Sequence, residues 1–366
     1  MANGKLYLSG EYAVVDGAAA IISSMYTRSL AAHFTVSGER DPRILVDEDA
    51  APTFDVNDRD RYVKAASYVA ARYCAESNRR PTLQSGQHLT VDIISTLVDG
   101  NGRKYGLGSS GAVTVAVIEA YLDWCAVDYN SVMVYKLAVL AELLVKDNGS
   151  FGDLASASTG RVISYRRPSL SCLEYLSSKM RDSSATFHDL VSAHWDGLEI
   201  HSNNALERLV AEKLHVVIGW TGEPASSADF VQRMAAYKSN QNEAYRSFCQ
   251  RSSEITRQMW SALERYNAED FVDSYRQQSK NITELSLVTG GYIETEKLAN
   301  AREIAESIGY AAKPSGAGGG DCLIAMKAVD GVSNAGRESQ TFNEAAELTR
   351  RWQAAGIMVM TDWKLK

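Results

Sequence analysis

The sequence predicts a protein of mixed helices and strands that is built as two domains. The chain has 366 residues, which corresponds to about two domains of ordinary size. Hydrophobic residues make up 45% of it and charged residues 23%, as in globular proteins with well-filled cores. Two helical segments follow one another at 109–124 and 131–146 without a strand between them, which argues against a regular βαβ order.

In the first half, apolar runs with strand-like alternation lie between turn residues and helical segments. The run HLTVDIISTLV ends in Asp99-Gly100-Asn101-Gly102, a strong turn sequence, and DNGSFGD (147–153) is predicted to be a loop. The segment 58–77 has acidic residues near its start, which favours a helix there. Strands are therefore predicted at 5–8, 12–15, 30–36, 43–48, 88–98 and 161–167, and helices at 58–77, 109–124 and 131–146.

The second half begins with LHVVIGW (214–220), a continuous apolar run typical of a buried strand. Polar helices are predicted at 226–239, 242–266, 268–289 and 294–309, and a glycine loop then leads into a strand within 313–327. A helix at 341–354 and a strand at 356–361 follow. Polar residues accumulate near 195–210, so we expect the division there, giving domains 1–200 and 201–366.

Composition argues against several classes of function. The net charge of −7 argues against a general nucleic-acid-binding protein, although it allows a local site for a small anion. Five widely spaced cysteines without a C-x-x-C motif make a disulfide framework or a zinc site unexpected. The N-terminus lacks a secretory pattern, and the most apolar helical segment is interrupted by Glu119. The simplest interpretation is a soluble cytoplasmic protein.

The stretch GLGSSG, from Gly106 to Gly111, fits the dinucleotide-binding pattern G-x-G-x-x-G. That interpretation requires a strand directly before it and a βαβ unit after it, and the sequence predicts neither. The glycines and the following apolar helix more generally predict an anion site made of backbone N–H groups. The structural alternative is a helix whose N-cap is one of the serines, Ser109 or Ser110.

Four segments together resemble a known family. They are GKLYLSGEYAV near the start, RKYGLGSSGAV, DNGSFGDLA, and SGAGGGDC near the end. In this order they resemble the galactokinase, homoserine kinase, mevalonate kinase and phosphomevalonate kinase superfamily, over nearly the whole chain. Within this superfamily, the amino-acid sequences of the four segments look most like those of the phosphomevalonate kinases. The resemblance implies an α+β fold, with an N-terminal ATP-binding domain of the ribosomal-protein-S5 type and a C-terminal ferredoxin-like domain that closes over the acceptor.

The resemblance also implies roles for individual residues. Gly106, Leu107, Gly108, Ser109, Ser110 and Gly111 would hold the ATP phosphates. Asp153 would lie near the transferred phosphoryl group and Lys5 would pair with it. Ser110 would bind Mg²⁺, with Ser109 as second choice. Glu142 stands eleven residues before Asp153, the spacing of the second metal ligand in mevalonate kinases, and its alternative is a solvated glutamate on a helix surface.

The resemblance places the acceptor against two groups of residues. One is the third motif, from Ser315 to Gly320, which would form a flexible backbone wall; four glycines within five residues make a purely structural role the weaker alternative. For Tyr12 and Trp220 an ordinary core role remains equally open. The implied acceptor contacts are Tyr12, Lys104, Ser150, Trp220, Thr221, Ser226, Ser227, Ser315, Gly316, Ala317, Gly318 and Gly319.

Chemistry favours a phosphate over a hydroxyl acceptor. A hydroxyl must lose its proton as it attacks, whereas a phosphate monoester, with a second pKa of about 6, is already largely a dianion. The difficulty is then repulsion between two polyanions, which fixed positive charge must offset. Arg103 and Lys104 directly precede GLGSSG, and Lys5 and Lys146 border the other motifs. We therefore expect Lys104 to contact the acceptor phosphate; the alternative is a solvated turn lysine.

The predicted activity is transfer of the ATP γ-phosphoryl group to (R)-5-phosphomevalonate in the mevalonate pathway of isoprenoid biosynthesis. The alternatives are a mevalonate kinase or another small-alcohol kinase of the same fold, and, from a different class, a catalytically silent ATP-binding sensor. The expected cofactors are ATP and Mg²⁺. The expected partners are these small molecules alone, with no nucleic acid and no membrane, for a chain that acts as a monomer or homodimer.

Overall fold

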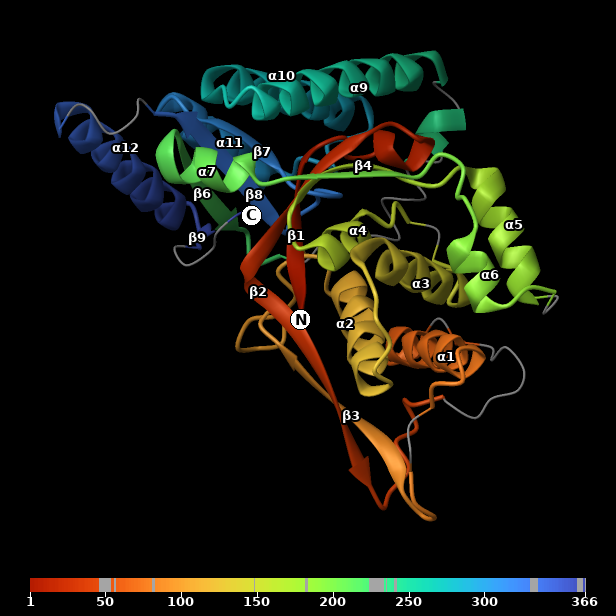
Figure 1. Ribbon diagram of the computed structural model, residues 1–366. Helices are drawn as coiled ribbons and strands as arrows, with labels where there is room; N and C mark the ends of the chain where they lie inside the picture. Colours follow the sequence, from red (N-terminus) through yellow and green to blue (C-terminus); the bar gives the residue numbers. More distant parts are fainter. Residues whose placement is uncertain are drawn as a thin grey trace.

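Two antiparallel sheets with helices packed around them make up the computed structural model (Figure 1). Within the part of the chain that is described, one sheet has five strands and the other has four. The described residues are 1–45, 54–55, 57–80, 83–147, 149–181, 184–223, 234, 236–239, 242–329, 335–360 and 365.

The first sheet consists of β1 (Ala2–Ser9), β2 (Ala20–Ser37), β3 (His88–Ser95), β4 (Val162–Arg166) and β5 (Glu199–Asn203). Strand β2 is its centre and is 18 residues long. It pairs with β1 and β4 through residues 20–30 and with β3 through residues 30–37. Strand β5 extends the sheet beyond β4. Strand β1 carries most of the first motif, the segment GKLYLSGEYAV (residues 4–14), and lies near the middle of the molecule (Figure 1).

Helices lie beside the first sheet, as Figure 1 shows. Helices α2 and α3 are apolar on nearly all sides, and most of their residues are buried. Helices that are apolar on all sides are typical of a protein core. The helices of this half are α1 (Arg61–Glu76), α2 (Ser109–Trp124), α3 (Ser131–Leu144), α4 (Gly152–Thr159), α5 (Leu170–Arg181) and α6 (Phe187–Ser192).

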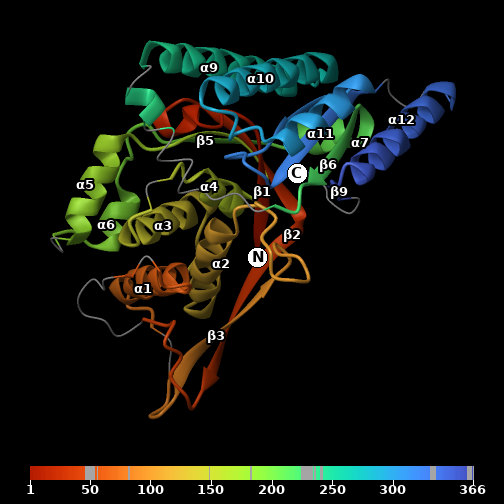
Figure 2. The ribbon, with the colours of Figure 1, turned by 180° about the vertical axis from the view of Figure 1, so that it is seen from behind.

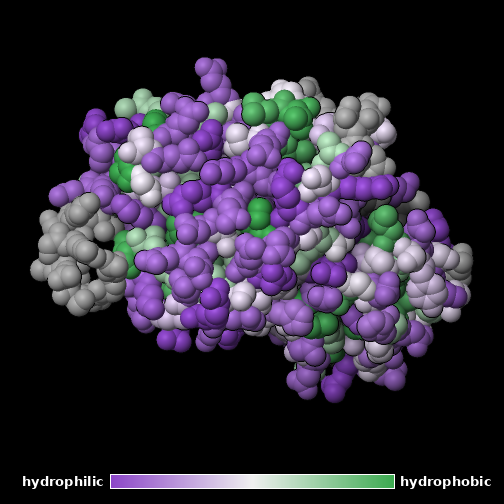
Figure 3. Space-filling view, turned by 90° about the horizontal axis from the view of Figure 1, so that it is seen from above, coloured by the Kyte–Doolittle hydropathy of each residue, from purple (hydrophilic) through white to green (hydrophobic). Residues whose placement is uncertain are grey.

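The second sheet has the order β7 (Ala311–Pro314), β8 (Cys322–Ala328), β6 (Leu214–Trp220) and β9 (Met358–Val359). The helices of this half are α7 (Ala205–Glu212), α9 (Asn242–Glu264), α10 (Ala268–Val288), α11 (Glu296–Ser307) and α12 (Ala335–Ala354). Helices α9 and α10 pack side by side (Figure 2). Both contact β1, and α10 also contacts β7 and β8. Seen from above, the face over these helices is mostly hydrophilic (Figure 3).

Most predicted elements are confirmed, including β6 at 214–220 and the start of α2 at Ser109. The strand predicted at 12–15 is wrong, because a short 3-10 helix, η1 (Ala13–Asp16), occupies this place. The backbone has positive φ at both Gly10 and Tyr12, so the chain turns there and cannot continue extended.

Three other predictions need correction or fall outside the described chain. The loop predicted over 147–153 ends earlier, because α4 already begins at Gly152. No strand forms at 43–45, where the side chain of Asp41 accepts a hydrogen bond from the Arg43 N–H and closes a turn; the rest of that predicted strand, 46–48, is not described. Most of the helix predicted at 226–239 is likewise outside the described residues. The domain division near 200 stays a prediction.

Candidate active site

The start of α2 has an unusual cap. Its N-cap is Gly108, in the left-handed conformation with φ of 75°, and this cap residue supplies no side-chain hydrogen bond to the first turn. The structural alternative, a serine as N-cap, is therefore wrong: Ser109 and Ser110 are already inside the helix. The first N–H groups of α2 are thus available to an anion, whose negative charge the helix N-terminus also favours.

Lys5 holds the glycine loop (residues 106–111) against the first sheet. Its backbone N–H donates to the Leu107 carbonyl at 2.9 Å, so β1 and the loop are joined through main-chain atoms. The Lys5 side chain then runs along Gly108, where an added Cβ would lie 3.1 Å from Lys5 Cε. Only a residue without a side chain allows this approach without displacement of Lys5.

Asp153 lies on the other side of the same loop, in the first turn of α4. A Cβ added at Gly108 would be 2.9 Å from Asp153 Cβ, and one added at Gly111 would be 2.6 Å from Asp153 Oδ2. The structure therefore brings Lys5 and Asp153 together at the glycine loop, although 148 positions separate them in the sequence (153 minus 5).

The electrostatics of Asp153 fit this arrangement. Burial raises the pKa of its carboxyl, the Lys5 ammonium opposes that rise, and the negative charge of Asp147 adds to it. Lys5 is the only cation among these causes. The Lys5 ammonium therefore favours the charged form of the Asp153 carboxyl, against the effect of burial.

Glu142 is buried near the end of α3, with an exposed fraction of 3%. The alternative of a solvated glutamate on a helix surface is therefore wrong. Burial raises the pKa of this carboxyl well above its usual range, and the negative charges of Asp153 and Asp147 add to the rise. Within the described part of the chain, Glu142 Oε1 has no hydrogen-bond partner. A divalent cation would satisfy this oxygen and offset the repulsion among the carboxylates.

The third motif (Ser315 to Gly320) reaches the same place from the second sheet. Ser315 Oγ accepts a hydrogen bond from the Tyr7 N–H at 2.8 Å, and the Tyr12 hydroxyl donates to the Ala317 carbonyl. A Cβ added at Gly316 would lie 3.3 Å from Lys5 Nζ. Lys5 is thus flanked by the glycine loop on one side and the third motif on the other.

A further glycine of the third motif, Gly318, lies where no side chain fits. Gly318 has φ of 71°, and a Cβ there would lie 2.1 Å from the Ile293 carbonyl oxygen. The neighbouring Gly319 N–H donates to that same carbonyl at 2.8 Å. The motif is therefore fixed to the segment before α11 by main-chain contacts that leave no room for a side chain.

The predicted acceptor residues differ in their accessibility. Ser150 is partly buried and shares a hydrogen bond of 2.8 Å with the Tyr7 hydroxyl. Trp220 is completely buried and packs edge-on against Tyr105 at 4.8 Å, which agrees with the core role that the sequence left open. Thr221 is also buried, and its N–H donates to the Asp321 carbonyl. Ser226 and Ser227 lie outside the described residues.

Lys104 is exposed at the end of the turn that precedes the glycine loop. Its neighbour Arg103 donates to the Asp99 carboxylate at 2.8 Å and to the Gly222 carbonyl at 3.3 Å, and its guanidinium lies 4.9 Å from the centre of the Trp220 ring. Within the described chain, no hydrogen bond or ion pair engages the Lys104 side chain. Arg103 therefore anchors this turn to the second sheet and leaves Lys104 available for a ligand.

Two residues of this region were missed by sequence reasoning. Glu11 and Lys313 form a fully buried ion pair between the first and third motifs. The sequence does contain an indication: both are charged residues inside otherwise apolar or glycine-rich segments, SGEYAV and AAKPSG. Which residue each of them meets could not be read from the sequence.

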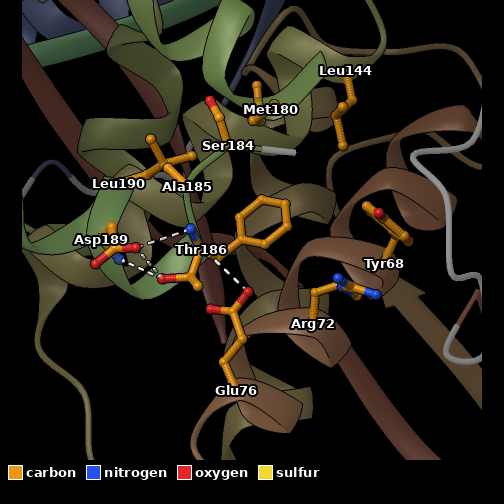
Figure 4. A pocket seen from close by; sticks show the side chains of 11 residues that line it. Tyr68, Arg72, Glu76, Leu144, Met180, Ser184, Ala185, Thr186, Asp189 and Leu190 are labelled. Carbon is orange, nitrogen blue, oxygen red and sulfur yellow. Dashed lines mark hydrogen bonds between the residues drawn. The ribbon is translucent and has the colours of Figure 1, made fainter. Parts of the chain in front are cut away.

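A cavity of about 250 Å³ lies elsewhere, between α1, α5 and α6 (Figure 4). Its polar side chains are largely engaged within the protein: Glu76 accepts hydrogen bonds from the N–H groups of Phe187 and His188, at 3.1 Å and 2.9 Å. None of the predicted site residues lines it. The cavity is therefore separate from the predicted site residues.

Comparison with known proteins finds relatives along most of the chain. The family description "GHMP kinases N terminal domain" matches residues 61–161, and "GHMP kinases C terminal" matches residues 267–357. The chain is 31% identical to the phosphomevalonate kinase of Streptomyces sp. (strain CL190), over 98% of this chain and 94% of that protein. It is 24% identical to the mevalonate kinase of Thermococcus onnurineus (strain NA1), over 89% and 87%.

A solved structure extends the likeness to three dimensions. The structure of Streptococcus pneumoniae phosphomevalonate kinase in complex with phosphomevalonate and AMPPNP superimposes with a TM-score of 0.77 and 25% sequence identity. The alignment covers 100% of this chain and 98% of that one. The α+β fold class predicted from the sequence is confirmed. In the described residues, no helix has the length and apolar character needed to cross a membrane.

Proposed function

The chain belongs to the GHMP kinase family, and we propose that it transfers the γ-phosphoryl group of ATP to the phosphate of (R)-5-phosphomevalonate, giving 5-diphosphomevalonate. One observation of the structure carries this proposal: Lys5 lies between the glycine loop and the third motif. A Cβ at Gly108 would meet Lys5 Cε at 3.1 Å, and a Cβ at Gly316 would meet Lys5 Nζ at 3.3 Å. One ammonium group can therefore reach phosphates held on either side.

The chemistry of a phosphate acceptor suits this site. Phosphoryl transfer depends mainly on positioning and on stabilisation of charge, and an acceptor that is already a dianion needs no base. The main difficulty is the repulsion between the two phosphate groups. Lys5 between the motifs and Lys104 beside the glycine loop supply fixed positive charge where the repulsion is greatest. Asp153 holds Lys5 in place more than it takes up a proton.

The residues present also fit Mg²⁺. Mg²⁺ prefers oxygen ligands, and it usually binds through one or two protein groups together with substrate phosphates. Glu142, whose Oε1 is buried without a partner among the described residues, and Ser110, in the first turn of α2, are the side chains that would hold it. When bound, the ion would neutralise charge on the phosphate oxygens of ATP. Ser109 remains the second choice for the serine ligand.

Changing Lys104 to Ala is expected to raise the KM for phosphomevalonate about tenfold to a hundredfold, because a charged hydrogen bond to the acceptor phosphate is lost. The KM for ATP should change less than about twofold. Steady-state kinetics with each substrate varied in turn measures both values. Lys280→Ala, at an exposed lysine on α10, is the matched control and should leave both unchanged. An equal rise in both constants would remove Lys104 from the acceptor site.

Changing Asp153 to Asn is expected to lower kcat by only about tenfold. A general base typically contributes about a hundredfold to ten-thousandfold, so a loss of that size is expected only where the acceptor must be deprotonated. The same substitution in a mevalonate kinase, at the matching aspartate, provides the comparison. Complete loss of turnover in the present enzyme would show that Asp153 acts as a base after all.

Two alternatives are separated by one assay of ADP release. A mevalonate kinase would release ADP with mevalonate as acceptor, and a silent ATP-binding sensor would release none above background with any acceptor. The proposed function predicts ADP release with phosphomevalonate and little with mevalonate or homoserine. The presence of Lys5, Asp153 and the glycine loop in mutual contact favours an active enzyme over a sensor.

A further inference from the structure

A buried ion pair joins the first motif to the third. Lys313, on β7, has an exposed fraction of 0%, and Glu11, just after β1, has 3%. The Lys313 ammonium donates to Glu11 Oε1, and the two residues are separated by 302 positions in the sequence. Burial lowers the pKa of Lys313, and the Glu11 carboxylate opposes that effect.

Stability alone does not account for this pair. Two charges lose much of their hydration when they are buried, and apolar residues of similar volume often stabilise an interior equally well or better. A buried pair does, however, impose a directional contact that apolar packing does not. The position of the pair is therefore more informative than its contribution to stability.

The pair is surrounded by contacts that fix the third motif to β1. Lys313 Nζ also donates to the Pro314 carbonyl at 2.9 Å and to the Tyr7 carbonyl at 3.4 Å. The Tyr7 N–H in turn donates to Ser315 Oγ at 2.8 Å. Lys313 thus sets where the chain leaves β7, immediately before the glycines that flank Lys5.

We propose that Glu11 and Lys313 are positioning residues. They fix where the third motif lies relative to β1 and thereby determine how tightly the acceptor is bound. This inference rests on the proposed function, in which the third motif contacts the acceptor. It assigns no contact with substrate to either residue.

The effect should fall mainly on the acceptor. The glycine loop, which would hold ATP, is attached to β1 separately, through the hydrogen bond from the Lys5 N–H to the Leu107 carbonyl. The hydrogen bonds of the Lys313 side chain go to β1, to Glu11 and to the residue after Lys313, and its ammonium also lies 5.5 Å from the centre of the Tyr275 ring on α10. The segment after the third motif does meet the glycine loop, where a Cβ added at Gly106 would lie 2.2 Å from Asp321 Cγ. Because Lys313 directly precedes the third motif, loss of the pair should nevertheless displace that motif more than the glycine loop.

The test is the double variant Glu11→Gln with Lys313→Met, which removes both charges together. Because no unpaired charge remains buried, its Tm should stay within about 5 °C of the parent. Its KM for phosphomevalonate should rise about tenfold or more, since small displacements of a substrate-positioning segment have large effects. Its KM for ATP should change less than about twofold.

The matched control is Lys327→Met with Glu344→Gln, which removes an ion pair of 2.6 Å between β8 and α12. It should change neither KM. An unchanged KM for phosphomevalonate in the folded double variant, or an equal rise in both constants, would overturn the inference. Should the double variant not fold, Glu11→Asp decides: it keeps both charges but draws the carboxylate back, so the same selective rise supports the inference and its absence overturns it.

Failure of the proposed function is detected separately. The unmodified enzyme is first assayed with phosphomevalonate and with mevalonate. If only mevalonate is turned over, the proposed acceptor is wrong, and the comparison of acceptor KM with ATP KM is then made with mevalonate. The positioning role of Glu11 and Lys313 is thereby tested whichever acceptor is used.

Discussion

Replacing Lys5 with Met is expected to lower kcat about a thousandfold, the largest effect of any change considered, because removal of a preorganised charge from a transition state typically has effects of this order. Lys5 is the cation beside Asp153, and it lies against both the glycine loop and the third motif. Methionine keeps the length of the side chain and its packing along Gly108, so the loss reports on the charge.

The measurement is kcat at saturating ATP and phosphomevalonate, with Tm as a check of folding. Lys213→Met is the control, since Lys213 follows α7 and contacts the Tyr266 carbonyl away from the three motifs. It should leave kcat unchanged. A Lys5→Met enzyme that keeps more than about a tenth of the original kcat would remove Lys5 from the transition state.

Replacing Gly111 with Ala should lower kcat about a hundredfold while hardly changing stability. A Cβ at this position would lie 2.6 Å from Asp153 Oδ2 and 2.7 Å from Asp153 Cγ, so Asp153 or the start of α2 must shift. Displacements of this kind at a reacting centre have effects of about a hundredfold. The added Cβ destabilises the fold where it forces this shift, whereas the intrinsic helix preference of Ala over Gly, up to about 1 kcal/mol, stabilises α2.

Measuring kcat and Tm of the same variant tests this prediction, because kcat should fall while Tm stays nearly unchanged. Gly38→Ala is the matched control, because a Cβ there meets no atom within 4 Å and the backbone φ is not in the left-handed region. It should alter neither quantity. A Gly111→Ala enzyme with full kcat would show that Asp153 has no fixed position relative to the glycine loop.

Local sequence patterns were sufficient to predict the helices and strands that depend mainly on interactions between residues close together in the chain. The apolar run 214–220 is β6, and the apolar helix after GLGSSG begins at Ser109. These patterns gave a wrong prediction where the backbone conformation of particular residues prevents the structure that the pattern favours. The segment 12–15 has strand-forming residues, yet positive φ at Gly10 and Tyr12 turns the chain into η1.

Pattern also failed where the environment of a side chain depends on packing. The spacing that singled out Glu142 could not distinguish a solvated glutamate from a buried one. The indication available was that α3 is apolar on nearly all sides, so it has little surface on which a glutamate could be solvated. The contact between Glu11 and Lys313 could not be predicted from local patterns. The two residues are 302 positions apart in the sequence, and their contact depends on how the two sheets pack together.

The central claim is that the acceptor of the phosphoryl group is itself a phosphate, and the product reports this directly. Phosphorus-31 NMR of the enzyme with ATP, MgCl₂ and phosphomevalonate should show the monoester resonance replaced by two coupled resonances of a diphosphate, together with ADP. A monoester resonance that persists while ATP is consumed to orthophosphate would contradict the account.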